Sequence, residues 1–141
     1  MYRSSLHVPG KIDVQMYLRY VIQRVEQGRT KYGLGKDVQC VVLVDRVGST
    51  GSSQDPALLR VLLPCFTAHF PGIIGKIYIA PINSVFFFIW GLASFLFDQA
   101  TRNNVRLLKG DYTTQLLQTM DRSVLVKSMG GDLVVPESSI F

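Results

Sequence analysis

Charge is missing from one long stretch of this 141-residue chain, because no Asp, Glu, Lys or Arg lies between Lys76 and Asp98. About 20 apolar residues suffice to cross a bilayer, so this stretch is long enough. Polar and helix-breaking residues interrupt it near its start, at Pro81, Asn83 and Ser84. Proline excludes a helical residue before it. The sequence therefore predicts a short strand over 77–80 and a separate helix over 85–97, capped by Ser84 and too short to span.

Cysteine is scarce, and the two residues Cys40 and Cys65 are far apart in the chain. This spacing fits neither a metal-binding pattern nor a disulfide framework. We expect buried free thiols, as in a reducing compartment. No apolar segment of signal-peptide length follows Met1, so the expected location is the cytoplasm.

Acidic residues are fewer than basic ones, 10 against 15, which gives a net charge of +5. A positive balance favours anionic partners. The chain nevertheless lacks the dense run of Lys and Arg that is typical of a nucleic-acid arm, so we expect no nucleic-acid partner. Its scattered basic residues fit a solvated surface or contact with acidic lipids.

The predicted helix over 85–97 is apolar on all sides and therefore has no obvious solvent face. Its six aromatic residues each gain about 1.5–3 kcal/mol on burial, on the order of 10 kcal/mol together: Phe86, Phe87, Phe88, Trp90, Phe95 and Phe97. Something must cover this surface. Two interpretations stay open, a plain core helix and a helix that covers an apolar ligand cavity and meets a membrane.

Strand and helix patterns alternate along the rest of the chain. Short apolar runs predict strands over 6–8, 39–44 and 105–108, the second buried on both faces. Three helices are predicted to begin at an Asp cap, at Asp13, Asp55 and Asp111. The first should end at Gly28, the second should run towards Phe70 with a kink at Pro64, and the third carries Leu116, Leu117 and Met120. A polar turn is predicted over 98–104. This order predicts an α/β fold with a mostly parallel sheet.

Catalytic patterns are weak. The Gly- and Ser-rich loop 48–53 precedes a helix and could cradle a phosphate, but it matches no phosphate-loop motif and Asp55 would repel the anion. Neither His7 nor His69 has an acidic partner nearby in sequence, so both are interpreted as structural. Asp45 at a strand end is expected to bind loop amides. We predict no enzyme, no metal and no cofactor.

Five segments occur in the order seen in one known family. They are PGKID at 9–13, VLVDRVG at 42–48, HFPGIIGKIYIAP at 69–81, FLFD at 95–98 with Thr101, and LKG at 108–110 with Tyr112, Leu116, Leu117 and the Gly130-Gly131 pair. In this order they resemble the CRAL-TRIO lipid-binding domains, over most of the chain from Val8 to Gly131.

The resemblance implies a lipid cavity between sheet and helices, lined by Val42, Val44, Phe66, Ile77 and Ile79. It also implies that the helix from Val85 is a gate over this cavity, with Phe86, Phe87, Trp90 and Phe95 as its main side chains. The function implied is binding, transfer or presentation of a phospholipid or other hydrophobic molecule, with transient contact at a membrane surface. The alternatives are an interaction module with a filled core and a nucleotide-dependent α/β enzyme.

Headgroup residues follow from the same resemblance. Phosphatidylinositol-binding members carry a Glu where this chain has Gly72 and a Lys where it has Asn104, whereas Thr101 matches. We therefore expect a different headgroup mode, with Thr101, Asn104 and Arg102 as candidates. The expected domain covers 1–131, followed by a tail over 132–141. The helical region that usually precedes this domain is not seen, so the chain is expected to be a fragment or a reduced version.

Overall fold

Four parallel strands form the centre of the structure, a computed structural model that describes residues 2–35, 37–53 and 55–135. The strands lie in sequence order: β1 (Tyr2–Arg3), β2 (Cys40–Asp45), β3 (Ile74–Ala80) and β4 (Val105–Leu107). Every neighbouring pair is parallel, because a connection that contains helices returns the chain to the same end of the sheet. The predicted α/β fold with a parallel sheet is confirmed.

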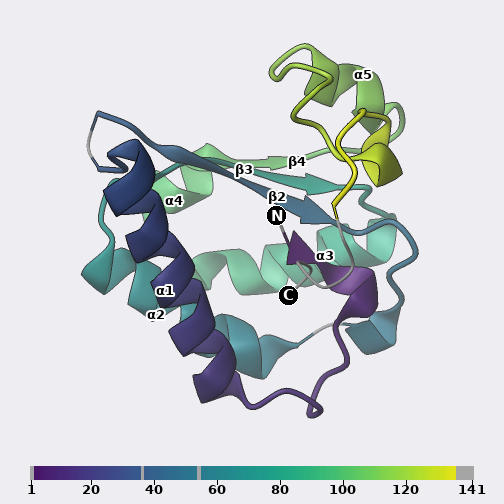
Figure 1. Ribbon diagram of the computed structural model, residues 1–141. Coiled ribbons are helices and arrows are strands. Elements are labelled where there is room, and N and C mark those ends of the chain that lie inside the picture. Colours follow the sequence, from purple (N-terminus) through teal and green to yellow (C-terminus); the bar gives the residue numbers. More distant parts are fainter. Residues whose placement is uncertain (1, 36, 54, 136–141) are drawn as a thin grey trace.

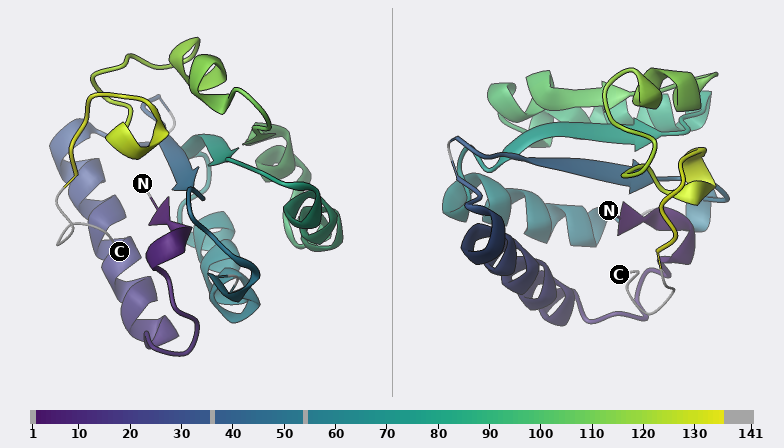
Figure 2. Two further views of the ribbon diagram at one scale, coloured as in Figure 1. Left: turned by 90° about the vertical axis from the view of Figure 1, so that its right-hand side faces the viewer. Right: turned by 45° about the horizontal axis from the view of Figure 1, so that its top comes forward.

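The helices divide unequally between the two faces of this sheet. Three long helices lie on one face: α1 (Val14–Tyr32), α2 (Pro56–His69) and α3 (Ser84–Ala93) (Figures 1 and 2). On the other face, α5 (Tyr112–Leu117) and the 3-10 turn η4 (Lys127–Met129) lie over the carboxyl end of the strands. We call the first the three-helix face and the second the capped face.

The capped face holds the most completely buried side chains. Leu116 of α5, Leu125 and Met129 have no exposed surface and pack on Leu43 and Tyr78 of the sheet. The chain after α5 folds back on itself, since Leu133 N donates to Leu125 O at 3.0 Å. A glycine is required at 131, because a Cβ there would overlap the carbonyl of Leu125.

Three aspartates cap helices as predicted. The carboxylate of Asp13 accepts from Met16 N at 2.8 Å, that of Asp55 from Leu58 N at 2.9 Å, and that of Asp111 from Thr114 N at 3.1 Å. Each bond satisfies an amide that the first turn of a helix leaves without a partner. The α2 helix continues through Pro64 to His69, close to the predicted end.

Two predictions about the N-terminal region are wrong. The first strand is Tyr2–Arg3, not 6–8, because the pairing available is with the end of β2, where Tyr2 lies beside Val44. The α1 helix also passes Gly28, which packs against the side chain of Leu34, and ends at Gly33, whose φ is +68°. A helix commonly ends at a glycine with positive φ, and here Gly33 takes that conformation instead of Gly28.

Three further boundaries differ from the predictions. Asn83, not Ser84, caps α3, and its side chain accepts from Phe86 N at 2.8 Å. The predicted helix over 85–97 ends earlier, at Ala93, and is followed by the 3-10 turn η3 (Ser94–Leu96). The segment predicted as a turn over 98–104 contains the short helix α4 (Gln99–Asn104). A helix of six residues is too short to show a helical periodicity in the sequence.

Candidate functional site

The strand residues predicted for the cavity share one face of the sheet. Val42 lies opposite Ile77 and Val44 opposite Ile79 in the β2–β3 register. Strand side chains alternate, so all four point to the three-helix face while Leu43 and Tyr78 point to the capped face. The fifth predicted residue, Phe66, belongs to α2 on the same face, but its side chain lies outside the described part of the structure.

Burial differs between the two faces of these same strands. Val42, Val44 and Ile77 are only half-buried although they stand on the two central strands. On the capped face, Leu43 is 7% exposed and Tyr78 is 9% exposed, whereas Val41 near the start of β2 is 55% exposed. Ile79 is the buried exception on the three-helix face, at 7%. Central strands of a parallel sheet are normally covered on both faces, and we predicted this for β2. The observed exposure of its side chains shows that the prediction is wrong. Solvent reaches part of the three-helix face.

The α3 helix touches this face through two aromatic side chains one turn apart. Phe86 and Trp90 pack on the cluster of Ile79, Ile82 and Val105. The ring of Trp90 also lies 5.0 Å from that of Phe97, centroid to centroid. Positions four apart share one side of a helix, so this pair defines the inner side of α3.

The outer side of α3 is apolar and exposed. Phe87 of α3 and Phe95 of the following turn η3, two of the predicted gate residues, are 62% and 72% exposed. Val85, Phe88 and Leu92 of α3 are exposed as well. We expected the all-apolar helix to have no side facing solvent. That expectation is wrong for the single chain. Among the described residues, no helix has the length and hydropathy needed to cross a membrane.

Arg46 is a residue of this region that sequence reasoning did not select. It follows β2 directly, is buried, and its guanidinium carbon lies 4.0 Å from the centroid of the Phe86 ring. Its backbone N–H donates to Ala80 O at 2.7 Å, which fixes it at the end of β3. Burial lowers the pKa of this guanidinium from its usual value. The strand-end position was visible in the sequence, but a stacking partner forty residues later was not.

A small pocket lies beside this contact. Its volume is about 60 Å³, and it is lined by the loop after β2 and the start of α3: Arg46, Ser49, Thr50, Gly51, Asn83, Val85, Phe86 and Ile89. Another hollow lies along α1, where it is lined by polar residues such as Gln23 and Lys31. The strand residues predicted for the cavity line neither of these two.

The headgroup candidates lie on α4 at the other end of the sheet, where β4 begins (Figure 1). Arg102 is exposed and Asn104 is half-buried, next to Val105 of the three-helix face; the side chain of Thr101 is outside the described part. Gly72 occupies a turn with a φ of +77°, and its carbonyl accepts from Gln39 Nε2 at 2.8 Å. This backbone favours glycine, which disfavours a glutamate there.

The start of α2, which follows the loop over 48–53, is occupied by the protein's own groups. The Asp55 carboxylate caps α2 and binds His7 Nε2 at 2.8 Å. Burial alone would raise the pKa of Asp55, but the amide of Leu58 and the His7 side chain outweigh it and hold the pKa below 3.8. Asp55 also holds a negative charge at the helix N-terminus, where a phosphate would have to bind.

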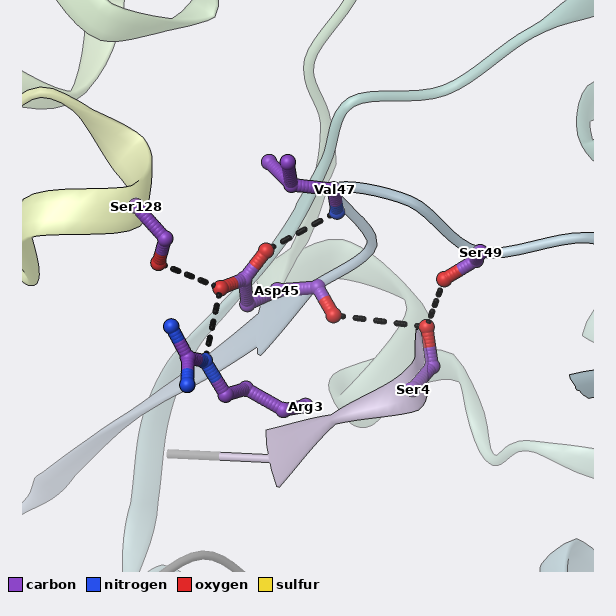
Figure 3. A network of polar contacts seen from close by, with 6 residues as sticks. All are labelled: Arg3, Ser4, Asp45, Val47, Ser49 and Ser128. Carbon is purple, nitrogen blue, oxygen red and sulfur yellow. Dashed lines mark hydrogen bonds and ion pairs between the residues drawn. The ribbon is translucent and has the colours of Figure 1, made fainter. Parts of the chain in front are cut away.

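Asp45 ties three distant segments together, as Figure 3 shows. Its carboxylate accepts from Val47 N at 2.9 Å, from Ser128 Oγ at 2.6 Å and from Arg3 Nε at 3.3 Å. Ser4 Oγ donates to the Asp45 carbonyl and contacts Ser49. The predicted bond to a loop amide is confirmed, and the carboxylate is a structural tie between β1, β2 and η4. In the described part, no group of three acidic, His or Cys residues could hold a metal.

Comparisons with known proteins agree with this arrangement. No curated protein sequence matches the chain. The family model of the CRAL/TRIO domain, however, matches residues 1–131 of the 141. With a parallel sheet, three helices on one face and a match over most of its length, the chain belongs to the CRAL/TRIO domain family.

Proposed function

We propose that this chain binds one hydrophobic molecule between the three-helix face and α1–α3, with α3 as a gate, and exchanges it at a membrane surface. Domains of this family bind and transfer hydrophobic ligands, generally without catalysis. The cavity would be lined by Val42, Val44, Phe66, Ile77 and Ile79, and the gate would present Phe86, Phe87, Trp90 and Phe95.

The incomplete burial of the central strands carries this proposal. Val42, Val44 and Ile77 are only half-buried in the middle of the sheet, whereas Leu43 and Tyr78 on the opposite face are buried. Exposed aliphatic side chains cost about 25 cal/mol for each Å² of apolar surface left in water. An apolar guest that covers them recovers this free energy without any change in the capped face.

The outer side of α3 supports contact with a membrane. Its exposed aromatic residues, with Phe88 68% exposed, form an apolar surface on a ten-residue helix. A helix of this kind inserts at the boundary between headgroups and acyl chains. The chain's net charge of +5 favours an acidic lipid surface. We therefore propose a peripheral, cytoplasmic protein.

The polar end of a lipid would be held differently from phosphatidylinositol in other members. Gly72 supplies no carboxylate, and Asn104 supplies no cation. We propose Arg102, with Asn104 and Thr101, as the headgroup contacts, because α4 leads directly into β4 at the edge of the proposed cavity. A guanidinium would pair with a lipid phosphate.

The test is transfer of a fluorescent phosphatidylcholine from donor to acceptor vesicles by two matched variants. Val42→Trp places a large ring on the three-helix face and should reduce transfer to the rate without protein. Val41→Trp, the adjacent residue on the opposite face and 55% exposed, should transfer as the parent does.

Equal transfer by both variants, with both folded by circular dichroism, would place the lipid elsewhere. Absence of transfer by the parent protein, together with no lipid bound, would refute the proposed function.

A further inference from the structure

We propose that Arg46 is a positioning residue that latches α3 onto the sheet through the Phe86 ring. The inference deepens the proposed function, because it names the contact that would hold the gate closed. It does not depend on lipid for its test.

The latch joins a fixed element to a weakly attached one. On the fixed side, Arg46 is tied to β3 by the bond from its N–H to Ala80 O, and the preceding Asp45 is held by three side-chain contacts (Figure 3). Arg46 therefore sits at a firmly held point of the sheet. On the other side, α3 touches the sheet cluster through Phe86 and Trp90.

The geometry is that of a cation–π contact. The guanidinium carbon lies 4.0 Å from the Phe86 centroid, well within the limit of about 6 Å for such pairs. Arg46 is buried and Phe86 is half-buried, so little water screens the contact. Desolvated pairs of this type are the stronger ones. The contact meets α3 in its first turn, beside the Asn83 cap, where the helix leaves the sheet.

Release of the latch has a measurable consequence. A helix of ten residues is marginal alone in water, so α3 should lose its helical hydrogen bonds when it leaves the sheet. Backbone amides then exchange at a rate set by the population of the released state. Loss of the cation–π contact should raise that population about tenfold.

The experiment is a double-mutant cycle on the full chain, read by hydrogen exchange of the α3 amides. Arg46→Leu should speed exchange about tenfold, and Phe86→Leu should speed it at least as much, because it also loses packing on the sheet cluster. The double variant should exchange no faster than Phe86→Leu alone. Arg46→Lys, which keeps the charge, should restore part of the protection and stands in if Arg46→Leu does not fold. Phe88→Leu combined with Arg46→Leu is the control pair, because Phe88 is exposed and outside the pocket that Arg46 lines. The increases in exchange rate caused by these two substitutions should multiply in the double variant.

Multiplicative effects of Arg46→Leu and Phe86→Leu, or unchanged exchange in both, would overturn the latch. The outcome is separate from lipid binding. Coupling in a protein that neither binds nor transfers lipid would keep the latch and reject the proposed function, whereas transfer without coupling would do the reverse.

Discussion

The two faces of the sheet differ in how completely their side chains are covered. On the capped face, Leu116, Leu125 and Met129 have no exposed surface, and a network around Asp45 ties this region to the N-terminal strand. On the three-helix face, Val42 and Val44 are half-buried, and α3 turns an apolar side to solvent. Val42 and Leu43 are neighbours on one strand, so the difference depends on what covers each face of the sheet.

We infer that the two faces serve two different tasks, stability on the capped face and ligand handling on the three-helix face. On the capped face, Leu116, Leu125 and Met129 are fully buried in one closely packed cluster. The three-helix face leaves apolar surface uncovered, which lowers stability and, under the proposed function, would leave surface for a guest. Substitutions should therefore affect stability on one face and ligand handling on the other.

The largest effect on stability is expected at Leu116. Leu116→Ala removes a side chain with 0% exposure and should lower the free energy of unfolding by about 3 kcal/mol. Val42→Ala on the other face should cost about 1 kcal/mol or less, because that side chain is already partly solvated. Urea unfolding monitored by circular dichroism measures both. Equal losses would remove the distinction between the faces.

A second prediction concerns the outer side of α3. Replacing Phe87, Phe88 and Leu92 together by Ser should weaken binding to acidic vesicles at least about tenfold, since each side chain gains about 1.5–3 kcal/mol on leaving water. Stability should hardly change, because all three side chains are exposed. Vesicle sedimentation gives the binding constant. Undiminished binding would assign the membrane contact to another surface.

Stiffening α3 should have a smaller effect of opposite sign. Gly91 lies inside the helix, and a Cβ there meets no atom within 4 Å. Gly91→Ala should therefore stabilise α3 by about 1 kcal/mol and slow exchange of its amides. Gly131→Ala is the contrast, because its Cβ would overlap Leu125 and should destabilise the capped face. Faster exchange in Gly91→Ala would show that the added methyl group disturbs the packing of α3 on the sheet.

The smallest effect is expected from the pair of Asp55 and His7. The folded-state pKa of Asp55 is below 3.8, so its contribution is present above that pH and is lost as the pH falls through the lowered value. Asp55→Asn should cost less than about 1 kcal/mol at pH 5, because Asn still caps a helix. The difference from the parent should shrink at pH 3. A difference that stays constant between these pH values would show that the carboxylate charge is not the cause.

Local patterns predicted much of this architecture, and tertiary contacts decided the rest. Asp13, Asp55 and Asp111 were identifiable as caps because a short acidic side chain before an apolar period has a local role. The end of α1 was not, because Gly28 packs on Leu34 and leaves Gly33 to end the helix. The partners of Asp45, Arg3 and Ser128, are far apart in sequence, and no local spacing relates them.

For the candidate site, the resemblance to the CRAL-TRIO domains selected four residues of β2 and β3, and the register of these strands places the four on one face of the sheet. The stacking of Arg46 on Phe86 was not predictable, because it depends on how α3 is seated on the sheet. The exposure of α3 was missed for a related reason. The composition of a helix shows that its apolar surface needs a partner, but it does not show which partner covers that surface.

Native mass spectrometry of the full chain purified from cells tests the central claim most directly. We predict a protein that carries one lipid-sized molecule, recovered in an organic extract, and a Val42→Trp variant that carries none while Val41→Trp keeps it. A parent protein that is lipid-free after gentle purification, and that takes up no lipid from phosphatidylcholine vesicles, would contradict the account.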